Sequence, residues 1–346
     1  METLWFCLVA IMLVTYVILD GFDLGVGIVH FSIGRTEAQR GLLLRTIGPV
    51  WDGNEVWLVA AGGTLYFAFP GLYASSFSGF YLPLMIVLWL LILRGISIEF
   101  RNHLDNPVWR PFWDAVFTGA SGLLAVFFGA ALGNAVRGVP LDASGYFFLP
   151  LWTDFRVGQE VGILDWYTIL VGILALLTLT QHGALWVALK TEEVLRQRAQ
   201  RVATAAWLGV AGMSLIVSGL TLRVQPQVSA NLKVCPWGYV FPALALAGLL
   251  GILRFLTQGA HLKAFLASCL YITGMLASAG FGVYPYVLPS NVDPKLGLTI
   301  HNTATSEYGL RVGLAWWIPG MLLALGYFVY VYRHFAGKVR SGDEGY

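Results

Sequence analysis

Long apolar stretches alternate with short polar segments along the whole chain, and this alternation predicts membrane-spanning helices. A bilayer core about 30 Å thick is crossed by roughly 20 apolar residues in a helix. Windows of that length predict nine spans, at residues 4–29, 53–71, 76–99, 113–135, 161–188, 202–222, 237–256, 262–284 and 311–333. We therefore predict an all-α integral membrane protein with nine transmembrane helices.

Composition supports this prediction and excludes two classes of protein. The chain is 57% hydrophobic and 12% charged, whereas a soluble domain carries roughly 25% charged residues. The 21 Lys and Arg residues nearly balance the 19 Asp and Glu residues. Bulk charge therefore gives no support for nucleic-acid binding, and we expect no soluble domain.

The distribution of basic residues predicts the orientation. With nine spans and the N-terminus outside, six of the 21 Lys and Arg residues lie in outer segments: Arg137, Arg156, Arg223, Lys233, Lys295 and Arg311. The other 15, from Arg35 to Arg340, lie in inner segments. Inner loops of membrane proteins are enriched in Lys and Arg. We therefore expect a periplasmic N-terminus and a cytoplasmic C-terminus.

Two long outer loops, at about 137–160 and 285–310, divide the predicted helices. Loops of this length usually pack over the protein or contact a partner. The simplest organisation is two four-helix bundles and one peripheral helix. It comprises residues 1–136 (first bundle), 137–160 (outer loop), 161–286 (second bundle) and 287–346 (outer loop, ninth helix and cytoplasmic tail).

Acidic residues inside the first predicted span indicate function, because a charge in a bilayer is costly. Asp20 and Asp23 are three residues apart, so their carboxylates project from one face of a helix. Gly21 and Gly25 are four apart, a spacing that lets another helix approach closely.

A second acidic pair, Asp52 and Glu55, opens the second predicted span. Because the first helix runs inward and the second outward, both pairs fall toward the inner face. Arg94, Glu99 and Asp114 lie at a similar level. Up to six carboxylates are thus predicted around one cytoplasmic mouth, where desolvation and mutual repulsion suit them to proton uptake.

Structural interpretations of these residues compete with the functional one. Asp52 can cap the second helix, and Asp20 can form an ion pair with Arg94. For Glu99 and Asp114 the structural interpretation is favoured. Two acidic pairs facing one mouth are harder to explain by capping alone, so the functional interpretation is favoured for them.

Histidines provide no convincing metal or haem site. Only His182 lies within a predicted span, and a haem or metal site needs convergent strong ligands at membrane depth. We expect His182 to form a hydrogen bond between helices, and we expect this chain to bind no metal.

Several motifs in this order resemble subunit II of the cytochrome bd-type quinol oxidases. The two most specific are Asp20-Gly-Phe-Asp-Leu-Gly-Val-Gly27 and Trp51-Asp-Gly-Asn-Glu-Val-Trp-Leu58. The likeness continues through Phe77–Tyr81, Gly133-Asn134 with Gly138-Val-Pro140, Tyr284–Ser290 and Ala304–Ser306, and so covers nearly the whole chain.

The resemblance implies a haem-free subunit of nine helices in a bacterial or archaeal cytoplasmic membrane. Its partner, subunit I, holds two b haems, haem d and the quinol-oxidation loop. The complex oxidises quinol and reduces dioxygen to water with protons taken from the cytoplasm. Some members hold a structural quinone or lipid in subunit II, and the resemblance leaves open small single-helix accessory subunits.

The resemblance also implies residue roles. The aspartate that matches Asp52 lies on a hydrophilic path toward the haems of subunit I, and Asp23 matches the second aspartate of the first motif. Two positions depart from many relatives: Val50 replaces a histidine and Glu55 replaces a glutamine. We predict a proton path of Asp52, Asp23, Asp20 and Glu55, supported by the polar or ion-pairing residues Arg94, Trp51, Asn54 and Glu99.

Two other functions remain open from the sequence. A proton-coupled secondary transporter also has many helices, intramembrane carboxylates and interrupted spans, but it predicts a site near the midplane rather than acidic residues at one face. A purely structural subunit differs from the oxidase interpretation only in whether its carboxylates carry protons.

Overall fold

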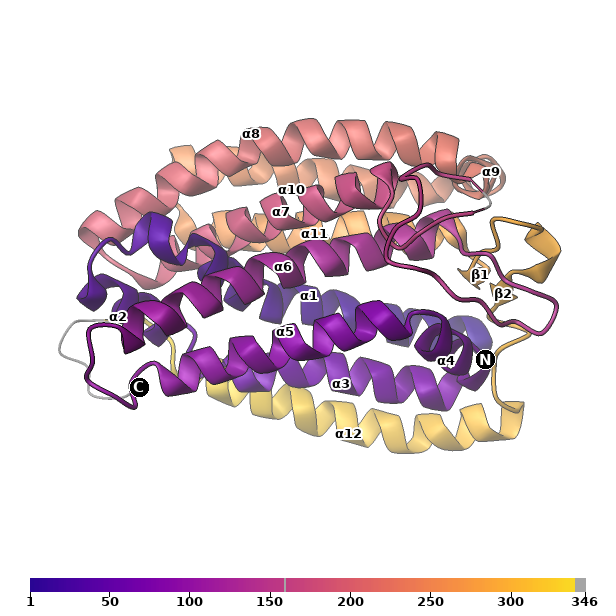
Figure 1. Cartoon of the computed structure of the whole chain (residues 1–346), viewed down its shortest axis with the longest axis horizontal. Helices are drawn as coiled ribbons and strands as arrows, with labels where there is room; N and C mark the ends of the chain where they lie inside the picture. The colour runs from indigo at the N-terminus through magenta and orange to yellow at the C-terminus, as the bar shows by residue number, and fades with distance from the viewer. Residues whose placement is uncertain (159, 340–346) are drawn as a thin grey trace.

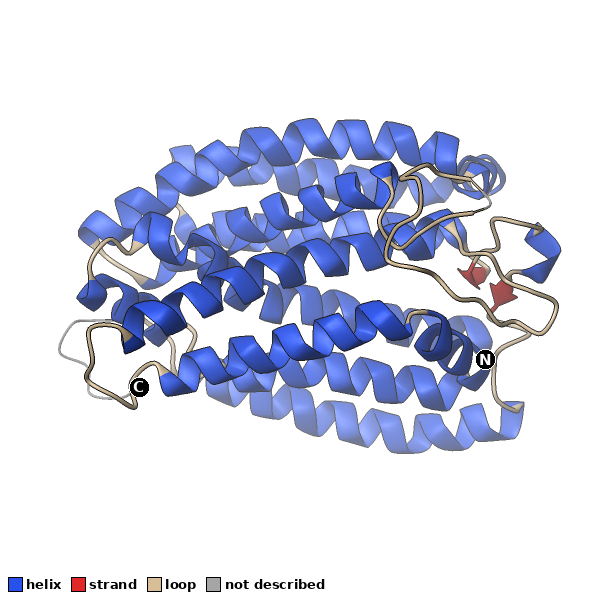
Figure 2. Ribbon diagram, in the orientation of Figure 1, coloured by secondary structure: helices blue, strands red, loops and turns tan. Residues whose placement is uncertain are grey.

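The computed structural model describes residues 1–158 and 160–339. Long helices lie side by side along one axis and form an elongated bundle (Figure 1). Apart from two short strands, the regular structure in these two ranges is helical (Figure 2). The predicted all-α class is therefore confirmed. Arg340 and the rest of the predicted tail from 340 to 346 lie outside the described residues.

Eight helices in the described ranges are long and apolar enough to cross a membrane. They are α1 (Glu2–Ile33), α5 (Tyr81–Phe100), α6 (Trp109–Arg137), α7 (Trp166–Lys190), α8 (Glu193–Val224), α10 (Val240–Thr257) with the preceding 3-10 helix η1 (Pro236–Tyr239), α11 (His261–Val283) and α12 (Glu307–His334). These correspond to eight of the nine predicted spans. The remaining span matches α3 (Trp51–Ala68), whose polar first turn lowers its mean hydropathy.

Two predicted boundaries differ from the structure for identifiable reasons. The predicted span 76–99 is divided between α4 (Pro70–Gly79) and α5, because Phe80 leaves the helical conformation between them. The predicted span 161–188 begins only at Trp166, because the side chain of Asp165 caps α7. Two further short helices, α2 (Glu37–Arg45) and α9 (Pro226–Val234), lie between the long ones.

The first helix is central to the packing. α1 packs against α7, α3 and α6, and α7 in turn packs against α6 and α8. The largest apolar core accordingly contains residues from both halves of the chain, including Phe22, Phe117, Tyr167, Ala203 and Ile272. The division into two four-helix bundles stays a prediction.

The last helix lies at the edge of the bundle, alongside α3 (Figure 1). Leu310 is the one residue of α12 that is buried within the described chain. Farther along, Phe328 packs on Trp57 of α3, with ring centroids 5.4 Å apart. α12 therefore presents most of its apolar surface away from its own chain.

The two long loops pack together over the end of the bundle where α1 begins, which we call the loop end; the opposite end, which carries α2, is the α2 end. β1 (Tyr286–Leu288) and β2 (Leu298–Thr299) pair antiparallel there and flank the 3-10 helix η2 (Pro294–Leu296). The backbone amide of Val139 donates to Pro289, and that of Asn291 donates to Val139. The loops thus cover the protein, as their length predicted.

Candidate functional site

Close contact between α1 and α7 holds the acidic pair of α1 inside the bundle. Gly25 lies against the backbone at Gly183, and a Cβ on either glycine would overlap the other helix. Gly21 faces the same helix. The predicted close approach at these small residues is confirmed. Asp20 and Asp23, on the same stretch of α1, are fully buried.

Asp20 forms a two-pronged ion pair with Arg94 of α5. Arg94 Nη1 donates to Oδ2 at 2.9 Å and Nη2 donates to Oδ1 at 2.5 Å. Neither side chain is exposed. Such bidentate pairs are the strong form of charge-assisted hydrogen bond. The ion pair considered from the sequence is therefore present, while Arg94 Nε has no hydrogen-bond partner among the described residues.

Asp23 is bonded on one side only. Asn54 of α3, itself fully buried, donates through Nδ2 to Asp23 Oδ2 at 2.8 Å. The hydroxyl of Tyr332, from α12, donates to Asn54 Oδ1 at 2.8 Å. Asp23 Oδ1 is buried without a hydrogen-bond partner in the described part of the chain. Tyr332 was not predicted, because nothing in the sequence of the last span marks a residue that bonds to Asn54 of α3.

The acidic pair of α3 lies between this buried cluster and the surface. Glu55 Oε2 is 3.8 Å from Arg94 Nη1, and its side chain is 24% exposed. Asp52 is exposed. The cap residue of α3 is Val50 and no side chain caps the helix, so Asp52 does not have the capping role considered above. Exposure thus increases from Asp23 through Glu55 to Asp52.

Trp51 and Glu99, which were both predicted to support the site, lie in different environments. The half-buried ring of Trp51 faces Gly95 of α5 and so lies beside the turn that carries Arg94. Glu99 is exposed at the end of α5, and its side chain forms no ion pair with the residues that the structure describes. The structure therefore brings Trp51, but not Glu99, to the cluster around Arg94.

Asp114 belongs to a separate cluster at the α2 end. Its buried carboxylate accepts from His30 Nε2 at 2.8 Å, from Arg40 Nε at 2.7 Å and from Arg101 Nε at 2.6 Å. These partners come from the end of α1, from α2 and from the residue that follows α5. One carboxylate thus joins several elements, which agrees with the structural interpretation favoured for Asp114.

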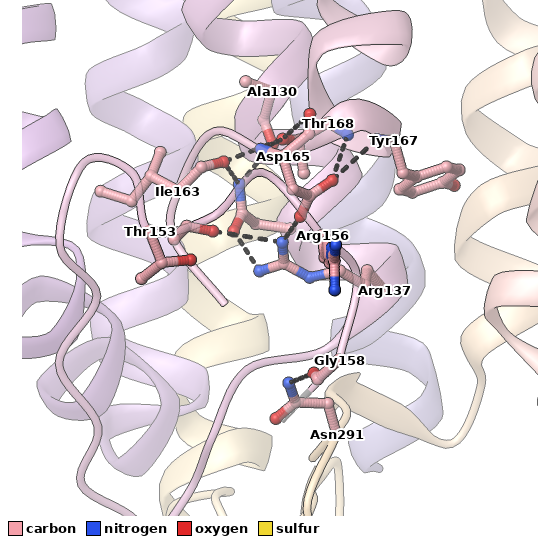
Figure 3. Close-up of polar contacts among 12 residues, drawn as sticks. Ala130, Arg137, Thr153, Arg156, Gly158, Ile163, Asp165, Tyr167, Thr168 and Asn291 are labelled. Carbon is pink, nitrogen blue, oxygen red and sulfur yellow. Dashed lines mark hydrogen bonds and ion pairs between the residues drawn. The ribbon is translucent and has the colours of Figure 1, made fainter. Parts of the chain in front are cut away.

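A third polar network, which the sequence did not predict, lies at the loop end (Figure 3). The buried guanidinium of Arg137, at the end of α6, forms an ion pair with Asp165 at the start of α7. It also donates to the carbonyls of Gly138 at 3.1 Å and Gly162 at 3.2 Å, and to Asn134 Oδ1 at 2.6 Å. Arg137 therefore fastens the outer loop to the ends of both helices.

The remaining atoms of this network are also bonded. Asn134 Nδ2 donates to the carbonyls of Ala130 and Ile163. Asp165 Oδ1 accepts from the backbone amides of Tyr167 and Thr168, and the Thr168 hydroxyl accepts from the Asp165 amide. Aspartate is a preferred residue at helix N-caps, so Asp165 was a usable signal for the start of α7, whereas Thr168 replaces the usual Glu or Gln of a capping box.

His182 forms the predicted hydrogen bonds between helices. Its Nε2 donates to the Ile18 carbonyl at 2.9 Å and its Nδ1 is 2.7 Å from Ser268 Oγ. The ring stacks on Phe265 at a centroid distance of 4.8 Å. Both ring nitrogens are thus engaged with α1 and α11. Within the described ranges, no group of three or more His, Cys, Asp or Glu side chains has a metal-binding arrangement.

Comparison with known proteins places these features in a family. The family model for cytochrome bd terminal oxidase subunit II matches residues 1–335. A probable cytochrome oxidase subunit 2 from Haemophilus influenzae is 33% identical over 97% of this chain and 94% of its own. Cytochrome bd ubiquinol oxidase subunit 2 from Bacillus subtilis is 31% identical over 90% and 89%. A chain of the bd oxidase from Geobacillus thermodenitrificans has a similar fold, with a TM-score of 0.76 at 19% identity, over 96% of this chain and 98% of that one.

Proposed function

The chain belongs to the cytochrome bd terminal oxidase subunit II family, and from this premise we propose that it supports a haem-bearing subunit I and conducts protons to it from the cytoplasm. The complex would oxidise quinol and reduce dioxygen to water in the inner membrane, where a multi-pass chain of this family belongs. No catalysis is expected from this chain alone.

The proposed topology has nine spans, with α3 as the ninth and the N-terminus outside. α3 lies among the long helices and runs beside α1 and α12. Its hydropathy is lowered in its first turns by Asp52 and Glu55, which belong to the proposed path, and by the supporting residue Asn54. An odd number of spans keeps the basic segments on one side, in agreement with the positive-inside rule.

The observation that carries the proton-path proposal is the buried Asp23 carboxylate with one oxygen left unbonded. A fully bonded carboxylate holds its neighbours in place, whereas an intramembrane carboxylate with a free oxygen can accept and release a proton. Glu55 is intermediate in exposure between the buried Asp23 and the exposed Asp52. We assign Asp52 as the entry, Glu55 as the next carrier and Asp23 as the inner carrier.

Asp20 and Arg94 have a different part in this proposal. Arg94 contacts Asp20 directly and lies 3.8 Å from Glu55. Its positive charge therefore attracts both carboxylates electrostatically. Val50, which stands where many relatives have a histidine, is buried and apolar. Glu55 then supplies a titratable group about one and a half turns from the position that lacks one.

The haems, two of type b and one of type d, are assigned to the partner subunit. Within this chain His182 lies at membrane depth, but its two nitrogens are bonded to Ile18 and Ser268. This side chain therefore does not fit a haem ligand in the observed arrangement.

The alternative function, a proton-coupled secondary transporter, is not favoured. It requires a substrate site near the midplane, and the family match spans almost the whole chain. A purely structural subunit is the alternative that differs least from our proposal, because the same contacts would stabilise a partner without conducting protons.

Two measurements test the proposal. The tagged chain is purified with its associated proteins, and a reduced-minus-oxidised visible spectrum is recorded; we expect a haem-bearing partner, and its absence would refute the oxidase assignment. Asp52→Asn is then compared with Asp105→Asn, a change to an exposed inner-loop aspartate whose side chain is 93% exposed. We expect only the first to slow quinol oxidation at unchanged haem content. If the two variants oxidise quinol at equal rates, the chain has a purely structural role.

A further inference from the structure

The contact between Tyr332 and Asn54 joins the edge helix α12 to the buried carboxylate of α1. We propose that Tyr332 is a positioning residue: its hydroxyl fixes the orientation of the Asn54 amide and thereby assigns the exchangeable proton of Asp23 to Oδ1. This inference rests on the proposed role of Asp23 as a proton carrier. It assigns a task to α12, which otherwise buries little of itself in its own chain.

The orientation of the Asn54 amide follows from its other contacts. Nδ2 lies 3.4 Å from the carbonyl of Leu19 and 2.8 Å from Asp23 Oδ2. A backbone carbonyl can only accept a hydrogen bond, so the end of the amide that faces α1 is the nitrogen. The oxygen end then faces Tyr332, whose hydroxyl must donate to it at 2.8 Å.

This orientation distinguishes the two oxygens of Asp23. Oδ2 accepts from Asn54 and therefore favours the state in which it carries no proton. Oδ1 has no hydrogen-bond partner among the described residues, so the proton of the neutral carboxyl group resides there. A reversed amide would point its oxygen at Asp23, hold a proton on Oδ2 and repel the ionised carboxylate.

The ring of Tyr332 is held independently of its hydroxyl. It packs between Trp186 of α7 and Phe328, one turn earlier on α12, with centroid distances of 6.4 and 6.3 Å. A phenylalanine would keep both ring contacts. Tyr332→Phe therefore removes only the donor to Asn54 Oδ1 and leaves the longer 3.4 Å contact with the Leu19 carbonyl as the other restraint on the amide.

Apart from the Tyr332 phenol, which carries no charge when protonated, the charged and titratable groups around Asp23 do not change in this variant. Arg94 of α5 and Asp20 of α1 remain paired, and Glu55 remains beside Arg94. The other groups that face this region come from α1, α7, α11 and α12 and are Tyr16, His182, Cys269 and Tyr332 itself. A change in pH dependence would thus report on the amide rather than on an altered set of charges.

The test uses the intact complex and three variants: Tyr332→Phe, Asp23→Asn and the matched control Tyr330→Phe, an exposed tyrosine on the same helix. Quinol oxidation is measured against pH, and infrared difference spectra in H2O and D2O record the C=O band of a protonated carboxylic acid. That band is assigned to Asp23 by its loss in Asp23→Asn.

For Tyr332→Phe we expect unchanged haem content and a displaced band. We also expect the acid limb of the pH profile to move up by about half to one pH unit, the size of one lost hydrogen bond. Tyr330→Phe should change neither readout.

The outcomes separate this inference from the proposed function. If Asp23→Asn abolishes turnover and the band while Tyr332→Phe moves neither the band nor the acid limb, the positioning role is wrong and the proton path stands. If Asp23→Asn turns over at the normal rate, the proton role of Asp23 fails, and this inference with it. Should Tyr332→Phe not assemble, Asn54→Leu replaces it, because it removes the donor to Asp23 at similar side-chain shape. The same upward shift is then expected, and an unchanged profile would overturn the inference.

Discussion

Two buried arginine–aspartate pairs differ in how completely their polar atoms are bonded. At the loop end, all three guanidinium nitrogens of Arg137 donate hydrogen bonds, and both oxygens of Asp165 accept them. Inside the bundle, Arg94 uses two nitrogens on Asp20 and leaves Nε without a partner in the described residues. The neighbouring Asp23 leaves an oxygen unbonded as well.

This difference is the one we expect if the network around Arg137 is structural and the cluster around Arg94 transfers protons, as we propose. Buried polar groups are nearly always bonded in native proteins, and each exception requires an explanation. The network around Arg137 has a structural explanation in full, because it joins α6, α7 and the outer loop. The cluster around Arg94 has polar atoms left over, and perturbed, incompletely bonded carboxylates are concentrated at functional sites.

The largest expected effect comes from Arg94→Met. Loss of the guanidinium leaves the buried Asp20 carboxylate without its partner, which should cost about 3–5 kcal/mol in the free energy of unfolding. Thermal unfolding of the purified complex measures this, and turnover should also be lost. The control is Arg94→Met combined with Asp20→Leu, which removes both charges and should recover most of the stability but not the activity. A single variant as stable as the wild type would contradict the buried pair.

A slightly smaller loss of stability, about 3 kcal/mol, is expected for Asp165→Ala, because it leaves Arg137 buried and unpaired and removes the cap of α7. Unlike Arg94→Met, it should leave quinol oxidation per haem unchanged in the complex that does assemble. Asp154→Ala, in an exposed pair of the same loop, is the control and should change neither quantity. A marked loss of turnover per haem in Asp165→Ala would contradict the purely structural role of the network around Arg137.

Asp23→Asn should have the opposite effects from Asp165→Ala, with stability retained and turnover lost. Asparagine has nearly the same shape, so the free energy of unfolding should change by less than about 1 kcal/mol. Turnover should fall roughly 10²-fold, the usual contribution of a proton-transferring group. Oxygen consumption per haem, measured beside the unfolding temperature, provides both values. A variant that loses stability but keeps its turnover would place Asp23 with the structural residues.

The smallest effect is expected at Asp142, on the surface of the loop end. The hydrogen bond from the Ser144 hydroxyl, together with backbone amides of Tyr146 and Ser144, lowers the pKa of the Asp142 carboxyl. A lowered pKa in the folded state means stability that is present above the unfolded pKa and is lost as pH falls through the folded one. Asp142→Asn should therefore unfold at a slightly lower temperature at neutral pH. The difference should disappear in acid; a difference that is independent of pH would exclude the charge as its cause.

The sequence predicted the spans well because each is a run of apolar residues, but it predicted the contacts between spans only in part. The acidic pairs and the small residues of α1 were visible locally, as was the pairing of Asp20 with Arg94. The start of α7 was misplaced because the cap at Asp165 follows apolar loop residues that cover the protein rather than cross the membrane. Tyr332 was not predictable, since its hydrogen bond joins residues 54 and 332 and helical periodicity does not tell which distant helix a residue meets.

The contact between Gly25 and Gly183 can form only after much of the chain has been synthesised. α1 is made first, but the helix that it packs against most closely is made only after α2 to α6 have been synthesised. At roughly 5–20 residues per second, this interval lasts on the order of ten seconds or more. Arg94 is synthesised before α7, so the ion pair with Asp20 becomes possible before the glycine contact does. The chain order therefore places the charge pair ahead of the close helix packing around it.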